Sequence, residues 1–186
     1  SLVYGATGSL DLPTIGAATV GADRTLLVTG MVFVVVGIAF KFGAAPFHMW
    51  LPDVYQAAPT AITLFIGSAP KLAVFGLAWR LLETGFGPYE VEWRLLLAGL
   101  ATLSLAIGNL AALVQANLKR MLAYSTVSHF CFLFLGLAGG GEAGYAAAMF
   151  YAIAYAIMAT AAFGAIVVLS RNGFEADRID DYKGLN

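Results

Sequence analysis

Of the 186 residues in the chain, 60% are hydrophobic and only 11% are charged, and the formal net charge is −1. A soluble domain carries about a quarter charged residues, so this composition excludes a water-soluble surface and predicts a protein whose outer face contacts a lipid bilayer. The near-neutral charge also offers no basic surface for nucleic acid, and the single cysteine, Cys131, excludes an intrachain disulfide and a cysteine-based metal cluster.

Residues 1–25 do not read as a signal peptide, because no basic segment precedes a short apolar core and a cleavage site. We expect them to form an outer loop ahead of a helix bundle over residues 26–170. The chain has no initiator methionine and stops at DRIDDYKGLN. We therefore expect residues 1–186 to be a single transmembrane domain within a longer subunit.

The first apolar segment predicts a helix over about 26–45, and it runs into the sequence FKFGAAPFHMWLPDVYQAAPT at residues 40–60. Here Lys41 is followed by the helix breaker Pro46. If the helix ends there, Lys41 is an anchor at the membrane surface. If it resumes toward Tyr55, Lys41 lies at a break inside the membrane, where polar groups often form ion sites. The spacing leaves both interpretations open.

The second segment predicts a helix over 60–83 with Lys71 near its centre. Lys71 is about 16 Å from either end at 1.5 Å per residue, too deep for its ammonium to reach the surface easily. A charge at that depth costs about 2.5–3.5 kcal/mol, and burial favours a neutral amine, which suits a proton carrier. Pro70 should also leave the carbonyl of Ile66 without its usual donor. The alternative is a structural lysine paired with a carboxylate, which must then come from outside this chain.

Three further helices are predicted over 93–117, 119–138 and 143–170. The connections between them are short, which predicts antiparallel neighbours in an all-α bundle of about five transmembrane helices, the first broken near Pro46. Small residues recur along two of these helices and would allow close approach, among them Gly99, Ala106, Gly108 and Ala111, and Ala147, Ala154 and Ala161.

Four polar residues of these helices are candidates for a proton path. His129 lies about 15 Å into its helix beside Ser128 and can exchange a proton near neutral pH, although a neutral histidine bonded between helices is equally consistent with the sequence. Tyr155 shares a helix face with Tyr151 and could line a hydrated path or simply pack between helices. Lys119 stands where two helices meet, so it is either a positively charged anchor or part of the path.

The distribution of basic residues predicts the orientation. One side carries five, namely Lys119, Arg120, Arg171, Arg178 and Lys183, and the other carries Arg24, Arg80 and Arg94. The excess places residues 171–186 in the cytoplasm as a polar connection. No nucleotide-binding motif, haem ligand pair or nucleophile with its base occurs, and the spacing around His48 and Asp53 specifies no metal site.

The segment FKFGAAPFHMWLPDVYQAAPT, with SAPKLAVFGLAWRLL and GNLAALVQANLKRMLAYSTVSHFCFLFLGL downstream, closely resembles the antiporter-like membrane subunits of respiratory complex I. The resemblance covers essentially the whole chain. It implies one repeat of an antiporter-like inverted-repeat fold, in which this chain corresponds to helices seven to eleven of fourteen. Pro70 departs from the Ser or Ala that is commoner in the family at that position.

The resemblance implies roles for the candidate residues. Lys41 matches the lysine of the broken helix and Lys71 the central lysine of the channel, both proton carriers, while Lys119 and His129 match positions on the path toward water. The glutamate that pairs with the first lysine is expected upstream of Ser1, and a further lysine downstream of Asn186.

The function implied is proton translocation as a subunit of a proton-pumping NADH:quinone oxidoreductase in the bacterial inner membrane or an equivalent energy-transducing membrane. The chain itself would bind no redox cofactor. NADH, flavin, iron–sulfur clusters and quinone are expected in partner subunits, and the partners are other antiporter-like and quinone-module membrane subunits. A subunit of an Mrp-type cation/proton antiporter, or a structural scaffold with inert lysines, are the alternatives.

Overall fold

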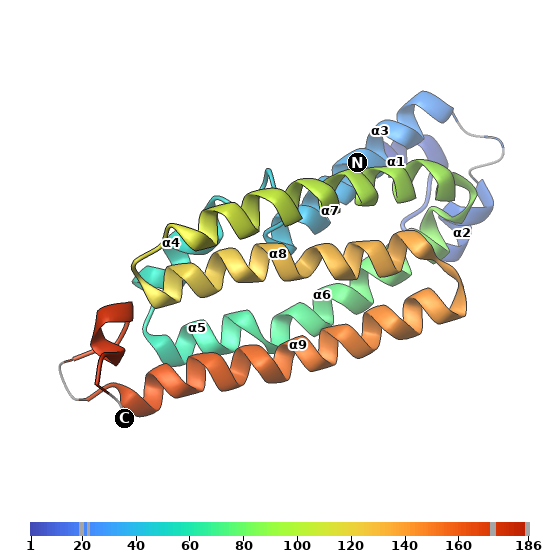
Figure 1. The fold of residues 1–186 in the computed structure, drawn as a ribbon. Coiled ribbons are helices and arrows are strands. Elements are labelled where there is room, and N and C mark those ends of the chain that lie inside the picture. Colours follow the sequence, from blue (N-terminus) through green and yellow to red (C-terminus); the bar gives the residue numbers. More distant parts are fainter. Residues whose placement is uncertain (19–20, 22, 172–173, 185–186) are drawn as a thin grey trace.

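The computed structural model describes residues 1–18, 21, 23–171 and 174–184, and within these residues the protein is helical with no β-strands. Figure 1 shows a bundle of long helices with short helices at one end. The α-helices are α1 (Leu2–Thr7), α2 (Leu12–Ala18), α3 (Arg24–Phe42), α4 (Trp50–Ala57), α5 (Thr60–Gly67), α6 (Ala69–Arg80), α7 (Glu90–Leu113), α8 (Leu118–Gly139) and α9 (Gly141–Leu169). A π-helical turn at Leu81–Gly85 and 3₁₀ turns at Gly87–Tyr89 and Ile179–Tyr182 complete the helical elements.

Five helical segments of the described chain are long and apolar enough to cross a membrane, which confirms the predicted all-α bundle. They are Arg24–Phe42, Thr60–Gly85, Gly87–Leu113, Leu118–Gly139 and Gly141–Leu169. Two of the spans, α3 and α8, begin at residues whose side chains cap the helix. Asp23 accepts the backbone N–H groups of Thr25 and Leu26, and Asn117 accepts that of Arg120.

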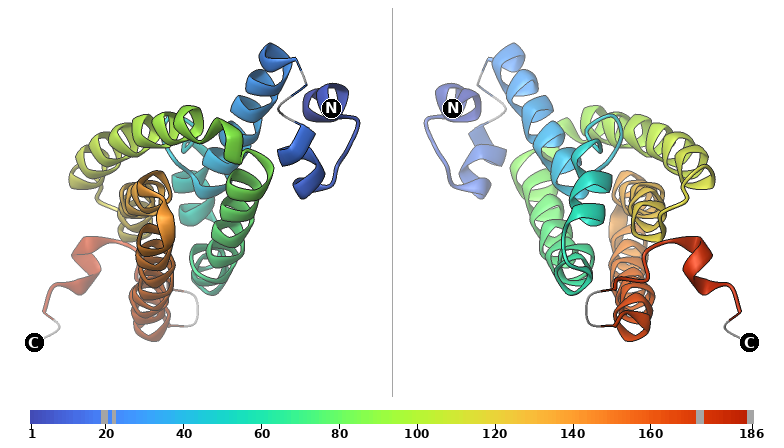
Figure 2. Two further views of the ribbon diagram at one scale, coloured as in Figure 1. Left: turned by 90° about the vertical axis from the view of Figure 1, so that its right-hand side faces the viewer. Right: turned by 90° about the vertical axis from the view of Figure 1, so that its left-hand side faces the viewer.

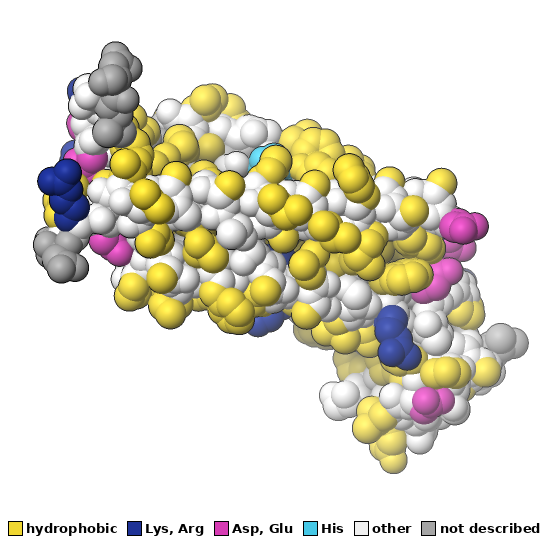
Figure 3. All heavy atoms as spheres, turned by 90° about the horizontal axis from the view of Figure 1, so that it is seen from below, with side chains coloured by type: hydrophobic (Ala, Val, Ile, Leu, Met, Phe, Trp, Pro, Cys, Tyr) yellow, Lys and Arg dark blue, Asp and Glu magenta, His cyan; other side chains and the backbone are white. Residues whose placement is uncertain are grey.

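The successive spans run antiparallel, as their short connections predicted (Figure 1). The basic residues predicted to share one side do lie together, since α8 begins where α9 ends and the C-terminal segment folds back (Figure 1). In Figure 3 most charged side chains lie toward the two ends of the face shown, basic atoms also show midway along its lower edge, and hydrophobic side chains are spread over the length between. Large aromatic residues of the long helices, such as Phe33, Phe65 and Phe150, are exposed, which suits contact with lipid.

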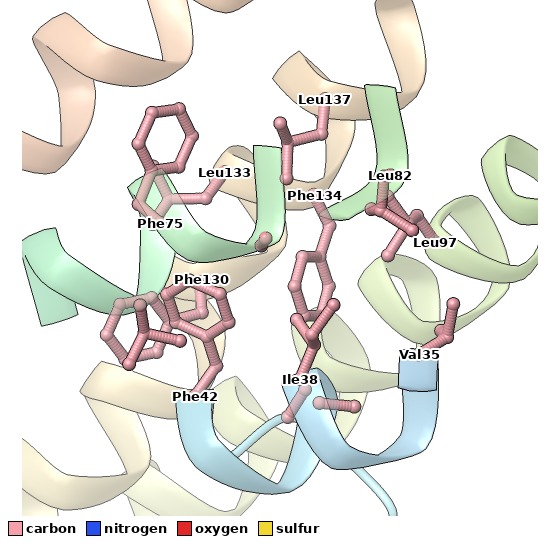
Figure 4. Packing of buried hydrophobic residues seen from close by; sticks show 14 of the residues in the cluster. Val35, Ile38, Phe42, Phe75, Leu82, Leu97, Phe130, Leu133, Phe134 and Leu137 are labelled. Carbon is pink, nitrogen blue, oxygen red and sulfur yellow. The ribbon is translucent and has the colours of Figure 1, made fainter. Parts of the chain in front are cut away.

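The core lies where α3, α6, α7 and α8 meet, and Figure 4 shows its side chains pointing toward one another. Phe42 of α3 packs against two rings of α8, Phe130 at a centroid distance of 5.1 Å and Phe134 edge-on at 5.5 Å. Phe75 of α6 closes the same cluster and is fully buried. This aromatic packing fixes the end of α3 against the middle of α8.

Two expectations about local structure were wrong. Residues 1–25 are not simply a loop, because α1 and α2 form within them and pack beside α3 and the π-helical turn (Figures 1 and 2). The helix predicted over 60–83 is also not continuous. It is interrupted at Ser68, where α5 ends and α6 begins, with Pro70 in the first turn of α6.

Proline is well tolerated in the first turn of a helix, where its missing N–H has no intrahelical partner to lose. The unusual Pro70 therefore starts a helix in this chain instead of kinking one. Ser68 stabilises the interruption through its hydroxyl, which donates to the carbonyl of Leu64 at 2.7 Å.

The expected close approach of helices through small residues occurs at Gly108. A Cβ atom built on Gly108 of α7 would lie 2.7 Å from the backbone nitrogen of Ser128 on α8. Gly99, one of the other residues named for this role, has nothing within 4 Å of such an atom. Of the two glycines of α7, only Gly108 is therefore required for the close approach to α8.

We expect Gly108→Ala to destabilise the protein by about 1–3 kcal/mol, because the added methyl group overlaps backbone that cannot move cheaply. Gly99→Ala should instead be neutral or stabilising by up to about 1 kcal/mol through its higher helix propensity. Thermal unfolding of the full-length protein in detergent measures both. Equal melting temperatures for the two variants would contradict the close contact.

Candidate functional site

The break in the first span is centred on the C-terminal end of α3. Gly43 ends the helix in the left-handed conformation, with φ of 78°, and its N–H donates to Phe40 and Ala39. The N–H of Ala44 donates to Ala39 at 2.8 Å, and the indole N–H of Trp50 donates to Phe40 at 3.0 Å. These bonds satisfy part of the set of carbonyls that every helix end leaves free.

Lys71 satisfies the remaining carbonyls of that end. Its Nζ donates to the carbonyl of Phe42 at 2.9 Å and to that of Lys41 at 3.2 Å. The side chain is buried, and its ammonium lies over the rings of Phe130, at 4.8 Å, and Trp50, at 5.6 Å. The negative end of the α3 dipole and the aromatic faces both favour a cation at this point.

The sequence analysis expected Pro70 to free the carbonyl of Ile66 and named no partner for Lys71 within the chain. The hydrogen bonds of Lys71 run to the carbonyls of a different helix, α3. Among the described residues, no carboxylate lies within ion-pair distance of Lys71, so the structural-lysine alternative still requires a partner from elsewhere.

Lys41 lies at the break, in the last turn of α3, and its side chain is exposed on this chain. The chain does become helical again beyond Pro46, at Trp50, which was the condition for Lys41 to lie within the span. Its own carbonyl accepts a hydrogen bond from Lys71. Since Lys71 stands near the middle of the second span, the break lies at a similar depth.

Three buried hydroxyl groups form a cluster between α4, α8 and α9, and we call Tyr55, Thr126 and Tyr155 the hydroxyl cluster. Tyr155 donates to Thr126 at 2.7 Å, and Thr126 donates to the carbonyl of Leu122 at 2.7 Å. Tyr55 is fully buried. Its hydroxyl lies near Thr126 and Tyr155 but has no hydrogen-bond partner among the described residues. The cluster consists of neutral hydroxyl groups, because neither a phenol nor an aliphatic hydroxyl ionises near neutral pH.

His129 lies beside this cluster and is bonded between helices, as one of its two interpretations predicted. Its Nδ1 and the hydroxyl of Tyr151 share a hydrogen bond of 2.5 Å, and its ring lies 5.0 Å from that of Tyr155. A cavity of about 120 Å³ adjoins these rings and is also lined by Ser125. Most of its lining is apolar, but Ser125, His129 and Tyr155 supply polar groups, and the volume is sufficient for a few water molecules. Ser128, named with His129 from the sequence, lies instead in the buried α7–α8 contact.

The side chain of Lys119 is buried, with only 1% of it exposed. Its Nζ donates to the carbonyl of Ala58 at 2.8 Å and forms an ion pair with Glu175 at 2.9 Å. Glu175 belongs to the segment after α9, which folds back over the start of α5 and α8. Its other oxygen, Oε1, accepts the backbone N–H and the hydroxyl of Thr60, both at 3.1 Å.

We call residues 174–182 the strap. In addition to the contacts of Glu175, two backbone hydrogen bonds hold the strap in place. The N–H of Leu118 donates to the carbonyl of Asp177 at 2.6 Å, and the N–H of Ile179 donates to the carbonyl of Ala116 at 3.2 Å. The amide of Asn117 donates to the Asp177 carboxylate at 2.7 Å. Within the predicted polar connection, residues 174–182 therefore cover one end of the bundle.

The sequence did not identify Glu175 or Thr126 as site residues. Thr126 could have been found, because it lies seven residues after Lys119 and so on the same face of α8. Glu175 carries no comparable signal, because its partners come from α5 and α8 through the path of an irregular segment. Among the described residues, no three His, Cys, Asp or Glu side chains gather as a metal site would require.

Residues 1–186 match the family of membrane segments described as NADH:quinone oxidoreductase/Mrp antiporter. NADH-quinone oxidoreductase subunit N of Xanthomonas euvesicatoria pv. vesicatoria is 67% identical over 187 residues, and the match covers 100% of this chain and 38% of that protein. The chain thus spans well under half the length of this relative.

Two solved structures show the same fold. A chain of respiratory complex I from Thermus thermophilus with bound aureothin has a TM-score of 0.74 at 37% identity, over 95% of this chain and 36% of that chain. A chain of the Mrp complex from Dietzia sp. DQ12-45-1b has a TM-score of 0.82 at 25% identity, over 94% of this chain and 32% of that one.

We expect Thr126→Val to destabilise the protein by about 1–3 kcal/mol, because the Tyr155 hydroxyl is left buried without a partner. Tyr155→Phe in the same background should recover much of that loss, since no orphan donor then remains. Thermal unfolding of the single and double variants measures the coupling. Thr102→Val is the control, because its hydroxyl is exposed and bonds only within its own helix. Strictly additive losses would contradict a direct bond.

Proposed function

Because the chain belongs to the NADH:quinone oxidoreductase/Mrp antiporter family of membrane segments, we propose that it carries protons across a membrane through its buried lysines. In this proposal it is part of a subunit of a proton-pumping NADH (or NADH-like):quinone oxidoreductase. The single observation that carries the proposal is Lys71, a buried ammonium at mid-span whose bonds run to backbone carbonyls and not to a carboxylate.

A lysine held by neutral carbonyls can lose its proton without leaving an unpaired buried carboxylate behind. A lysine whose carboxylate partner is also buried can do so only at a high cost, because the remaining carboxylate would be a buried charge without a partner. The binding site of Lys71 therefore tolerates both the charged and the neutral amine. Lys41, close by and exposed on this chain, is suited to exchange protons with Lys71 and with a group on a neighbouring part of the full subunit.

The proposed path continues from Lys71 toward the end of α8 that carries Lys119. His129, the hydroxyl cluster and the cavity beside them lie along that direction, and they supply the donors and acceptors that a proton needs between the lysines. Tyr155 belongs to this path by its contacts. Ser128 is close in sequence but lies in the α7–α8 contact, so we assign it a packing role.

The high identity to NADH-quinone oxidoreductase subunit N favours the redox-driven complex over an Mrp-type antiporter, whose similarity is strongest in the fold. The PDVYQ sequence at residues 52–56 and a last helix with Tyr155 in place of a histidine point the same way. The redox chemistry of such a complex would take place in partner subunits that hold NADH, flavin, iron–sulfur clusters and quinone. This chain would contribute the proton path and contacts to other membrane subunits.

We place the protein in the bacterial inner membrane or an equivalent energy-transducing membrane, with the strap in the cytoplasm. The support is the gathering of five basic residues at the end of the bundle where α8 begins.

We expect Lys71→Ala, introduced into the full-length subunit of the assembled complex, to lower the rate of proton pumping about tenfold or more, as loss of a proton-transfer group usually does. Proton uptake and NADH oxidation are measured together in membrane vesicles. Lys183→Ala is the control, because Lys183 is exposed and pairs only with Asp180. Full pumping by an assembled Lys71→Ala complex would leave only the scaffold function.

The orientation is tested by cysteine labelling. Cys131 is buried, whereas Asp180 on the strap is exposed. Among the described residues, the Asp180→Cys variant therefore has one accessible thiol, at position 180. We expect a membrane-impermeant maleimide to label it in inside-out vesicles and not in right-side-out vesicles. The opposite pattern would place the strap outside the cytoplasm.

A further inference from the structure

The ion pair between Lys119 and Glu175 lies between the buried polar groups and the water at one end of the bundle. We propose that Glu175 is the proton-transfer group through which Lys119 exchanges protons with that water. The inference rests on the proposed proton path and adds to it a residue, an end point and a role for the strap.

Burial is the first argument. Lys119 is 1% exposed, so water does not reach its ammonium, whereas 45% of the Glu175 side chain is exposed. The other partner of the ammonium, the carbonyl of Ala58, cannot carry a proton under ordinary conditions. Any proton that leaves or reaches Lys119 on this side must therefore pass the carboxylate.

The two oxygens of Glu175 bind different partners. Oε1 is held by the N–H and the hydroxyl of Thr60 at the start of α5, where a helix N-terminus favours a negative charge. Oε2 is thereby directed to Lys119 at 2.9 Å, within the range for proton transfer.

The hydrogen bond from Lys119 holds the pKa of Glu175 below its ordinary value. The carboxylate is therefore ionised and the pair intact at neutral pH. The stability that the pair adds is present above the ordinary carboxyl pKa and is lost only as the pH falls through the lowered one.

The interior side of Lys119 leads toward the proposed carriers. Ala123, Thr126 and Phe130 follow it at helical spacing along the buried face of α8, and the ring of Phe130 lies against the ammonium of Lys71. Lys119 and Phe130 are eleven residues apart, about 16 Å along the helix. The hydroxyl cluster occupies the middle of this interval.

The transfer step balances without any other reactant. When Lys119 has passed a proton inward it is a neutral amine, a much stronger base than a carboxylate. A proton from water that binds Oε2 then moves to Nζ, so that an O–H bond breaks and an N–H bond forms. The carboxylate and the ammonium are restored.

The charged groups nearby are engaged elsewhere. Arg120 of α8 binds Asp53 and Gln56 of α4. On the strap, the Asp177 carboxylate accepts from Asn117, and Asp180 pairs with Lys183. Within the described chain, Glu175 is thus the acid that contacts Lys119.

The test compares Glu175→Gln with Glu175→Asp in the full-length subunit of the assembled complex. Glutamine keeps a single acceptor oxygen, which can serve Thr60 or Lys119 but not both, and it cannot carry a proton, whereas aspartate keeps both oxygens and can. We expect the glutamine variant to pump about tenfold more slowly, with a loss that grows from pH 6 to pH 8 as protons in water become scarcer. The aspartate variant should recover a large part of the rate, and Asp180→Asn on the same strap should pump normally.

Complex assembly and amide hydrogen exchange of residues 174–184 show whether the strap stays in place. Normal pumping by Glu175→Gln at every pH would overturn the proposal. The proposal would also be overturned if the glutamine and aspartate variants lost activity equally and the strap was displaced or the complex failed to assemble. Glu175 would then serve only to hold the strap in place. Neither result bears on the proposed function of Lys71. That function would be refuted only by full pumping in the Lys71→Ala variant.

Discussion

The structure depends on a lysine that completes a helix end inside the bundle. A helix that stops at mid-span leaves carbonyls where no water can reach them, and each would cost several kcal/mol if left without a donor. Lys71 donates to two of these carbonyls, and the indole of Trp50 and the backbone of Gly43 and Ala44 donate to the others. The break stabilises the ammonium and the ammonium stabilises the break. A structural and a proton-carrying role for this lysine are therefore compatible.

The other half of the broken helix ends in a similar way. Lys119 donates to the carbonyl of Ala58, directly after α4, just as Lys71 donates to the carbonyls that end α3. Two buried lysines thus lie at the C-terminal ends of the two helices of one interrupted span, each at the negative end of a helix dipole. They differ in their other partners, since Lys119 also binds a carboxylate that water can reach and Lys71 binds only neutral groups.

The sequence predicted features that depend on local pattern and length. Five apolar segments gave the spans, and the depth of Lys71 within one of them gave a buried cation. The partner of Lys71 could not be predicted, because it comes from a different helix and only the folded chain brings Phe42 to it. The interruption at Ser68 was missed since proline was assumed to sit inside a helix and not to begin one. Glu175 was missed because an irregular segment has no periodicity from which a contact can be inferred.

The close approach of α7 and α8 at Gly108 has a consequence for motion. Two long, uninterrupted helices whose backbones touch behave as one rigid body, so relative sliding between them would force atoms to overlap. The segments around them are different, because the first span is interrupted between α3 and α4 and the second between α5 and α6. Hinges absorb rotation at such interruptions. Both lie near Lys71, so rearrangement of these spans against the α7–α8 pair would change the surroundings of this lysine first.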